Sequence, residues 1–584
     1  MKRAWVVLSS ASVAALVFAA DVQRAEACGC FTPPDPSVPV VQAGEQIAFS
    51  MENGQVTAHI KVSYEGPAED FGWLLPLPSV PTLELGVDEL FSQLITTTQP
   101  KYRLNREYHG ICPFDPNNPN RFGNAPSAGG GDSEGGPVDP DSIVVVQDSI
   151  GPYDYAVLRA DSQQPMLDWL SANHYFVPSA TAEAVTPYIH AGAYFLALKL
   201  QKGNDVGDLQ PVVVRYASDL PMIPIVLTGV GANENMPILV WMLGDGRAIP
   251  RNYYHTLVND VKIDWLNFGA NYIDVISKAV DESPDHHSFV TEFAGSTDVM
   301  KNVINWQGRF GVKGELAALS APQAFMDYLN YHGFAVQGSA APPSFSPQFT
   351  SQLLAVLGSE LPVPARVLEQ GITPTDYYIS IGYWSNWYQT AYPTQTDLDL
   401  TYDPVALADE IWTRVVEPTI AAGALFDRHP KLTRLFTTLS PREMTIDPVF
   451  SFNRHLPDVP NVRTGTLQFN CGFIGSEETD ITKVPATLIT EQGWHLSLPR
   501  GTAENPWLDS SMPHSLRTEV LREEGLPEVI DDNSGEIDQA VGGGNNRDGG
   551  CAIAAGASRS NTTFGALGLL GLAFALAAGL RRRR

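Results

Sequence analysis

Positive charge is scarce in this chain of 584 residues. It holds 37 Lys and Arg against 65 Asp and Glu, so its formal net charge at pH 7 is −28. A surface this acidic repels nucleic acid and anionic lipid headgroups, which excludes nucleic acid as a partner. It attracts divalent cations weakly, although most of these acids are expected to form a solvated surface.

Recognisable catalytic and metal-binding motifs are also missing. The zinc patterns H-E-x-x-H and C-x-x-C are absent. A G-x-S-x-G pattern at residues 131–135 lies in a loop rich in Gly, Pro, Asn and Asp, without the flanking strand and helix that a nucleophilic serine needs. Gly229 and Gly231 do not begin a dinucleotide-binding loop, because Glu234 stands at the third glycine position. The sequence predicts no cofactor and favours a protein that is not an enzyme.

The N-terminal residues have the pattern of a secretory signal peptide. Met1-Lys2-Arg3 is basic, residues 6–20 are apolar, and Ala25-Glu26-Ala27 fits the small-x-small cleavage pattern. Cleavage after Ala27 places Cys28 at the mature N-terminus. Lipidation of Cys28 is the alternative, but Ala25 stands where a lipoprotein signal has a large apolar residue. We therefore expect residues 1–27 to direct export.

The C-terminal residues predict a second targeting signal. Residues 564–580 form an uncharged apolar run, which four arginines follow. That run is at the short end for a membrane-spanning helix, and the arginines should stay cytoplasmic. Together with Gly549-Gly550-Cys551 and a spacer over 552–563, it resembles the MYXO-CTERM sorting signal of myxobacterial and related exported proteins. The resemblance implies an intramembrane sorting protease as partner and Cys551 as the processing point. A plain membrane anchor is the alternative.

Cysteine is rare, with five residues in the chain. Apart from Cys551, the candidates for disulfides are Cys28, Cys30, Cys112 and Cys471, which allow three pairings. Export to an oxidising compartment favours disulfides over free thiols. A Cys28–Cys30 bridge would close a strained ring, so a bond from the N-terminus to Cys112 or Cys471 is easier.

Apolar patterning in the first half of the chain indicates strands. Three β-branched runs, residues 212–214, 223–227 and 238–243, are separated by turn-forming residues and predict consecutive buried strands. Asn53-Gly54 predicts a hairpin. In its second strand apolar and polar residues alternate, which places His59 on a polar, exposed face.

Helical patterning dominates later in the chain. Residues 322–331 and 346–357 predict amphipathic helices, and residues 403–416 predict a further helix. The fold class is therefore α+β, with a β-rich N-terminal domain containing interspersed helices and a mainly helical C-terminal region. The predicted boundaries are 1–27 for the signal peptide, 28–320 for the mixed domain, 321–530 for the helix-rich region, 531–550 for a disordered linker and 551–584 for the sorting tail.

Three stretches contain residues with binding chemistry. Residues 281–287, Asp-Glu-Ser-Pro-Asp-His-His, crowd metal-ligand types together, but a polar loop after a helix is the favoured interpretation and metal binding the alternative. Asp397, Asp399 and Asp403 resemble a calcium loop in which Tyr402 and Ala408 replace the required Gly and Glu. Aromatic residues gather over 377–392, where core packing is favoured over a carbohydrate platform.

Several phrases resemble the DUF2330 family of exported bacterial proteins, over about residues 28–340. They are Glu45-Gln46-Ile47-Ala48-Phe49, Tyr64-Glu65-Gly66, Asp70-Phe71-Gly72-Trp73-Leu74-Leu75-Pro76, Ile150-Gly151-Pro152-Tyr153-Asp154, Asp168-Trp169-Leu170 and Phe289-Val290-Thr291-Glu292-Phe293. The resemblance implies no activity and no site residues, because the family has none assigned.

Two functions from different classes follow. The first is an exported, envelope-anchored or surface-displayed protein with a binding or structural role. Its C-terminal helix would hold it to the membrane, and the sequence does not identify its surface ligand. The alternative is an extracytoplasmic hydrolase that uses paired carboxylates such as Glu65, Asp70 or Glu292. Calcium-dependent adhesion is a third possibility. The sequence predicts no catalytic, cofactor-binding or metal-binding residue with enough specificity to commit to one.

Overall fold

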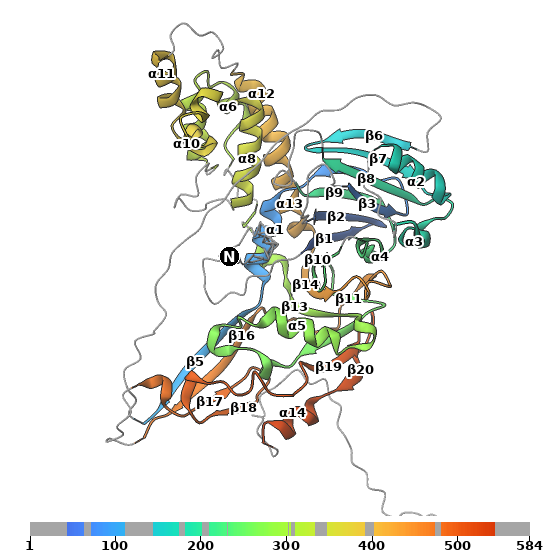
Figure 1. Cartoon of the computed structure of the whole chain (residues 1–584), viewed down its shortest axis with the longest axis vertical. Coiled ribbons are helices and arrows are strands. Elements are labelled where there is room, and N and C mark those ends of the chain that lie inside the picture. Colours follow the sequence, from blue (N-terminus) through green and yellow to red (C-terminus); the bar gives the residue numbers. More distant parts are fainter. Residues whose placement is uncertain are drawn as a thin grey trace, which may run out of the picture.

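A large mixed sheet runs through the centre of the molecule (Figure 1). The computed structural model describes residues 44–62, 72–110, 144–173, 181–200, 210–230, 232–301, 303–304, 310–332, 334, 347–391, 402–472 and 480–542. The sheet has ten strands in the order β20-β19-β12-β13-β14-β10-β1-β2-β9-β4. Their bounds are β1 Glu45–Glu52, β2 Gln55–Val62, β4 Thr82–Leu85, β9 Val212–Ala217, β10 Met236–Gly244, β12 Tyr254–Val258, β13 Ser288–Ser296, β14 Lys431–Leu439, β19 Ser515–Val520 and β20 Glu528–Asp532.

The hairpin β1–β2 forms as the sequence predicts. Asn53 and Gly54 both have positive φ, 51° and 74°, which is the backbone that an Asn-Gly hairpin turn requires. β1 then pairs in parallel with β10, and β10 pairs antiparallel with β14. Strand β14 follows the helices in the chain, yet it lies between β10 and β13 near the centre of the sheet.

Both faces of the central sheet are covered, so strand β10 is apolar on both sides. Ile238, Val240 and Met242 belong to one core, and Leu239, Trp241 and Leu243 belong to another. A strand buried on both faces reads as a continuous apolar run, which is how residues 238–243 look in the sequence.

The first face of the central sheet packs against a second sheet, of four strands in the order β3-β8-β7-β6. These strands are β3 Gly72–Leu77, β6 Val144–Ile150, β7 Tyr153–Arg159 and β8 Tyr194–Leu200. Their outer side is covered by short helices, α2 Gln163–Ala172, α3 Thr181–Ala184 and α4 Ile225–Thr228. The core between the two sheets holds Ile47, Phe49, Leu75 and Leu196, among others.

The second face packs against helices and a third sheet. The helices are α1 Asp88–Thr98, α5 Tyr272–Asp281 and α13 Glu417–Arg428. The third sheet, in the order β18-β17-β16-β5, consists of β5 Lys101–His109, β16 Val462–Asn470, β17 Ala486–Ile489 and β18 His495–Leu498. A two-stranded sheet joins β11 Arg247–Pro250 to β15 Phe450–Asn453, and α14 Ser534–Ala540 follows β20.

Most of the remaining helices form a unit with a core of its own, seen at the top of Figure 1. They are α6 Lys313–Ala317, α7 Pro322–Tyr331, α8 Pro347–Glu360, α9 Ala365–Leu368, α10 Pro374–Ile379, α11 Ile381–Ala391 and α12 Pro404–Ile411, which a π-helical turn joins to α13. The predicted α+β class is confirmed, with a β-rich N-terminal part and helices concentrated later in the chain. The predicted domain boundaries stay a prediction.

Two local predictions are wrong. Residues 223–227 do not form a strand, because Pro221 and Pro224 cannot donate to a sheet and α4 begins directly after Pro224. His59 is not exposed but 4% accessible. The polar face of β2 is exposed at Gln55 but buried at His59, since the sheet is covered on both sides there.

The predictions of a membrane-spanning C-terminal helix and of a disulfide pair are also corrected for the described part of the chain. No helix in the described part of the chain is both long and apolar enough to span a bilayer, which contradicts membrane attachment through a C-terminal helix. The predicted span at 564–580 lies outside the described residues. Cys471 is disulfide-bonded, but no second cysteine lies within the described ranges, so they contain no complete disulfide pair. Cys28, Cys30, Cys112 and Cys551 lie outside them, as does Ala27.

Candidate metal centre

The loop between α5 and β13 carries two of the three residues of the candidate site. Asp281 ends α5, and His286 follows in a short helical turn. Asp285 and His286 both have left-handed backbones, with φ of 54° and 60°. Two successive non-glycine residues in this region are strained, and such strain tends to occur at functional sites. The turn brings His286 Nδ1 to 3.5 Å from Asp281 Oδ1.

The third residue, Glu443, lies in the turn after β14. Its side chain is 5% exposed and held by its own turn. Oε2 accepts a hydrogen bond from the Ser440 N–H at 2.8 Å, and Oε1 accepts one from Arg442 Nη2 at 3.0 Å. Each carboxylate oxygen still has a lone pair free for another partner.

His287 holds the two segments together. Its Nε2 lies 2.7 Å from the backbone carbonyl of Glu443 and 3.1 Å from Thr445 Oγ1. Its ring packs against Tyr253, with the ring centroids 4.8 Å apart. The successive histidines therefore point in different directions: His287 is buried and locks the loop to the turn after β14, which leaves His286 beside Asp281.

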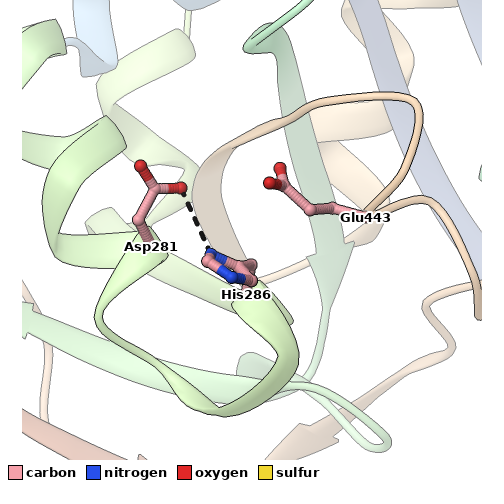
Figure 2. Close-up of side chains that lie close together, drawn as sticks. All are labelled: Asp281, His286 and Glu443. Carbon is pink, nitrogen blue, oxygen red and sulfur yellow. Dashed lines mark ion pairs between the residues drawn. The ribbon is translucent and has the colours of Figure 1, made fainter.

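Asp281, His286 and Glu443 together form a potential metal site. One ligand atom from each lies within 4.8 Å of the others, and Figure 2 shows Asp281 and Glu443 on either side of His286. Two ligands at about 2.4 Å from an ion can lie at most about 4.8 Å apart, whereas zinc ligands at about 2.1 Å lie within about 4.2 Å. Zinc binding therefore needs a small closing movement, which the partly exposed Asp281 and His286 side chains can make.

The charges around this cluster favour a cation. Burial raises the pKa of Asp281, the neighbouring Glu443 carboxylate raises it further, and His286 opposes the effect. The His286 Nδ1 atom is shielded from solvent and has no hydrogen bond. A bound cation would offset the repulsion between the two carboxylates, and Nδ1 could bind it in place of its 3.5 Å contact with Asp281 Oδ1.

The neighbouring acids of the predicted loop are not part of the cluster. Glu282 turns to β19, where it accepts hydrogen bonds from the Ser515 N–H and Oγ at 2.8 and 2.6 Å and from the His514 N–H at 2.8 Å. Burial opposes ionisation, yet the His514 side chain, whose Nδ1 lies 3.1 Å from Glu282 Oε1, and these bonds lower the pKa of Glu282 to about 2. Asp285 is exposed. Sequence reasoning found this loop but missed Glu443, because no local pattern marks a ligand that lies on another element.

Glu292 does not form a carboxylate pair of the kind that the hydrolase hypothesis needs. It is fully buried, and its Oε2 accepts from Arg434 Nε, while its Oε1 accepts from the Tyr272 hydroxyl at 2.7 Å. Both oxygens therefore contact hydrogen-bond donors rather than a second acid. Glu65 and Asp70 lie outside the described residues.

The other stretches with predicted binding chemistry have structural contacts. Asp403 Oδ1 caps α12, accepting from the Val405 and Ala406 N–H groups at 2.9 and 3.1 Å. Asp397 and Asp399 lie outside the described residues. Tyr377 and Tyr378 are fully buried in the helical core, and partly buried tryptophans of α11 pack against it.

Comparison with protein families shows what kind of chain carries this site. A family model described as "Uncharacterized protein conserved in bacteria (DUF2330)" matches residues 22–339. The chain belongs to this family, as its sequence phrases predict. No curated protein and no solved structure matches it. Asp281 and His286 lie within the matched residues, and Glu443 lies beyond them.

Proposed function

We propose that this member of the DUF2330 family is an exported binding protein that holds a divalent transition-metal ion at Asp281, His286 and Glu443. The observation that carries the proposal is the convergence of three ligand atoms to within 4.8 Å from two segments far apart in the chain. The set contains one imidazole and two carboxylates. Imidazole favours zinc and similar ions over calcium and magnesium, so we take zinc as the principal candidate.

The ion would serve to join two parts of the fold. The loop after α5 contains two strained residues, and the turn after β14 holds a buried carboxylate. A cation between them adds a link that the unfolded chain lacks. An ion present at about 100 times its dissociation constant raises the free energy of unfolding by about 2.7 kcal/mol.

Export is the second part of the proposal and rests on the sequence alone. The basic, apolar and small-x-small segments of residues 1–27 support it, and so does the similarity of Gly549-Gly550-Cys551 and its flanks to a sorting signal of exported proteins. A zinc site in an exported protein would fill from the extracytoplasmic metal pool. Membrane anchoring is not part of the proposal.

A titration of the metal-free protein tests the site. After treatment with a chelator, zinc should bind with a stoichiometry of one and raise the melting temperature by several degrees, more than calcium does at the same concentration. Glu443→Gln and His286→Asn should each reduce zinc affinity at least tenfold. Asn suits the left-handed backbone of residue 286, so that variant removes the imidazole with little added strain.

Asp285→Asn is the matched control. It removes an acid from the same loop and keeps a residue that tolerates a left-handed backbone, but it leaves the three ligands intact. Zinc affinity should be unchanged in this variant. Equal losses in all three variants, or no zinc binding by the parent protein, would contradict the proposed site.

Cell fractionation tests export separately. The protein should be recovered outside the cytoplasm with its N-terminus at Cys28. Recovery of an intact chain from the cytosolic fraction, beginning at Met1, would contradict export while leaving the metal site untouched.

A further inference from the structure

A cavity of about 220 Å³ lies between the ten-stranded sheet and the four-stranded sheet that covers its first face. Its walls are mostly apolar. They include Ile47 and Phe49 of β1, Ala58 and Ile60 of β2, and Leu75 of β3. An engineered apolar cavity of about 150 Å³ is known to bind benzene, so this one has room for a molecule with a single ring and a short substituent.

One wall residue does not fit an apolar core. Glu45 begins β1 on the same face as Ile47 and Phe49, and it is 5% exposed. Its Oε2 atom is buried and has no hydrogen bond. Burial raises the pKa of Glu45 to about 7, and no neighbouring charge contributes to the shift. A buried carboxyl group without a partner costs several kcal/mol, which a donor brought in by a ligand would offset.

Within the described part of the chain, no positively charged side chain lies close enough to the Glu45 carboxylate to shift its pKa. The other titratable side chains that line the cavity are Tyr188, His190 and Tyr216. Burial raises the pKa of both tyrosines, so they stay neutral at pH 8. At that pH the cavity offers an apolar interior with a single negative group on its wall.

We propose that this cavity binds a small apolar amine, with the hydrocarbon part between the two sheets and the ammonium group against the Glu45 carboxylate. The amine supplies both the positive charge and the hydrogen-bond donors that Glu45 lacks. The site shares no residue with the metal cluster, so either proposal can fail without the other.

Calorimetric titration of the full-length protein with benzylamine tests the proposal. Benzyl alcohol is the neutral comparator, because it has nearly the same shape. At pH 8 benzylamine should bind at least tenfold more tightly than benzyl alcohol. In Glu45→Gln the two should bind about equally. Ala58→Leu, which fills the cavity from β2 and keeps Glu45, should abolish binding of both.

The pH dependence of the parent protein provides a test without any variant. Lowering the pH from 8 to 5 protonates Glu45, so the preference for benzylamine should disappear while benzyl alcohol binds unchanged. His190 also lines the cavity, and the same pH series on Glu45→Gln isolates any contribution from it. Failure of both compounds to bind, equal affinities at pH 8, or a preference retained in Glu45→Gln would overturn the proposal.

Discussion

The two faces of the ten-stranded sheet each bury a glutamate, but they provide very different surroundings for it. On the face under α1 and α5, Glu292 contacts Arg434 and the Tyr272 hydroxyl. On the opposite face, Glu45 lies at a cavity with one oxygen unpartnered. The first carboxylate is neutralised by the fold and serves stability. The second destabilises the isolated protein, which makes its surroundings the better candidate for binding.

The packed face depends on a local irregularity. The register of β13 against β14 shifts between Thr291 and Phe293, so Glu292 is an extra residue in its strand. Such a bulge changes the direction of a side chain. The Arg434 guanidinium also lies over the Trp241 ring, 5.6 Å from its centroid, and the Trp241 N–H donates to Thr98 Oγ1 at 3.0 Å.

Removing Arg434 should have the largest effect. Arg434→Met leaves the fully buried Glu292 carboxylate without its cation, and we expect a loss of about 3–5 kcal/mol in the free energy of unfolding, measured by urea denaturation. Arg434→Met combined with Glu292→Leu should recover most of this loss, because no charge then remains buried.

Arg454→Met is the surface control for that experiment. Arg454 pairs with Asp245, and both side chains are at least half exposed. Its removal should cost less than about 1 kcal/mol. A similar cost for the buried and exposed arginines would mean that the Glu292 pair does not stabilise the packed face.

Removing the charge of Glu45 should stabilise the protein. Its folded pKa of about 7 lies above its ordinary value of 4.5, so the cost of burying the charge is absent below pH 4.5, grows as pH rises, and is complete above pH 7. Glu45→Gln should therefore stabilise by about 3 kcal/mol at pH 8 and have no effect at pH 4. Denaturation midpoints of the two proteins at both pH values measure this, and a pH-independent difference would contradict it.

Burial of His59 should make the free energy of unfolding fall as pH is lowered, which is a smaller pH dependence than that from Glu45 and of opposite sign. Burial, together with the nearby charges of Arg215 and Arg428, lowers its pKa from 6.5 to about 3. Above pH 6.5 the imidazole is neutral in both the folded and the unfolded chain. As pH falls from 6.5 toward 3, only the unfolded chain takes up the proton, so the free energy of unfolding decreases. Between pH 7.5 and 5 the parent should lose about 2 kcal/mol more than His59→Gln does. Parallel pH profiles for the two proteins would show that His59 does not titrate as a buried group.

Local sequence patterns predicted the elements more reliably than the contacts between them. Asn53-Gly54 predicted a hairpin that forms, and the helix predicted over 322–331 is α7, with Phe325 and Met326 buried. The prediction for His59 failed because alternation in a strand says which residues share a face, but not whether that face is covered. Residues 223–227 were misassigned because their apolar run outweighed the two prolines beside it.

The candidate sites also show that local sequence patterns do not predict contacts between distant elements. Residues 281–287, with Asp281 and His286 among them, could be named in advance as an alternative metal-binding stretch because ligand types are neighbours there, although a polar loop was the favoured interpretation. Glu443 could not, since His287 and Glu443 are 156 residues apart and meet only when β14 enters the sheet beside β13. Glu45 also carried no signal, because a glutamate at the start of a strand is ordinary until the strand is covered.

The sequence by itself determined the acidic surface charge, the β1–β2 hairpin, the amphipathic helices and membership of the DUF2330 family, because these depend on composition or on neighbours a few positions away. The tertiary structure alone decided that Arg434 neutralises Glu292, that Glu443 lies beside His286, and that a cavity lies beside Glu45. Those contacts join segments from distant parts of the chain, and they arise only when the sheets and helices pack together.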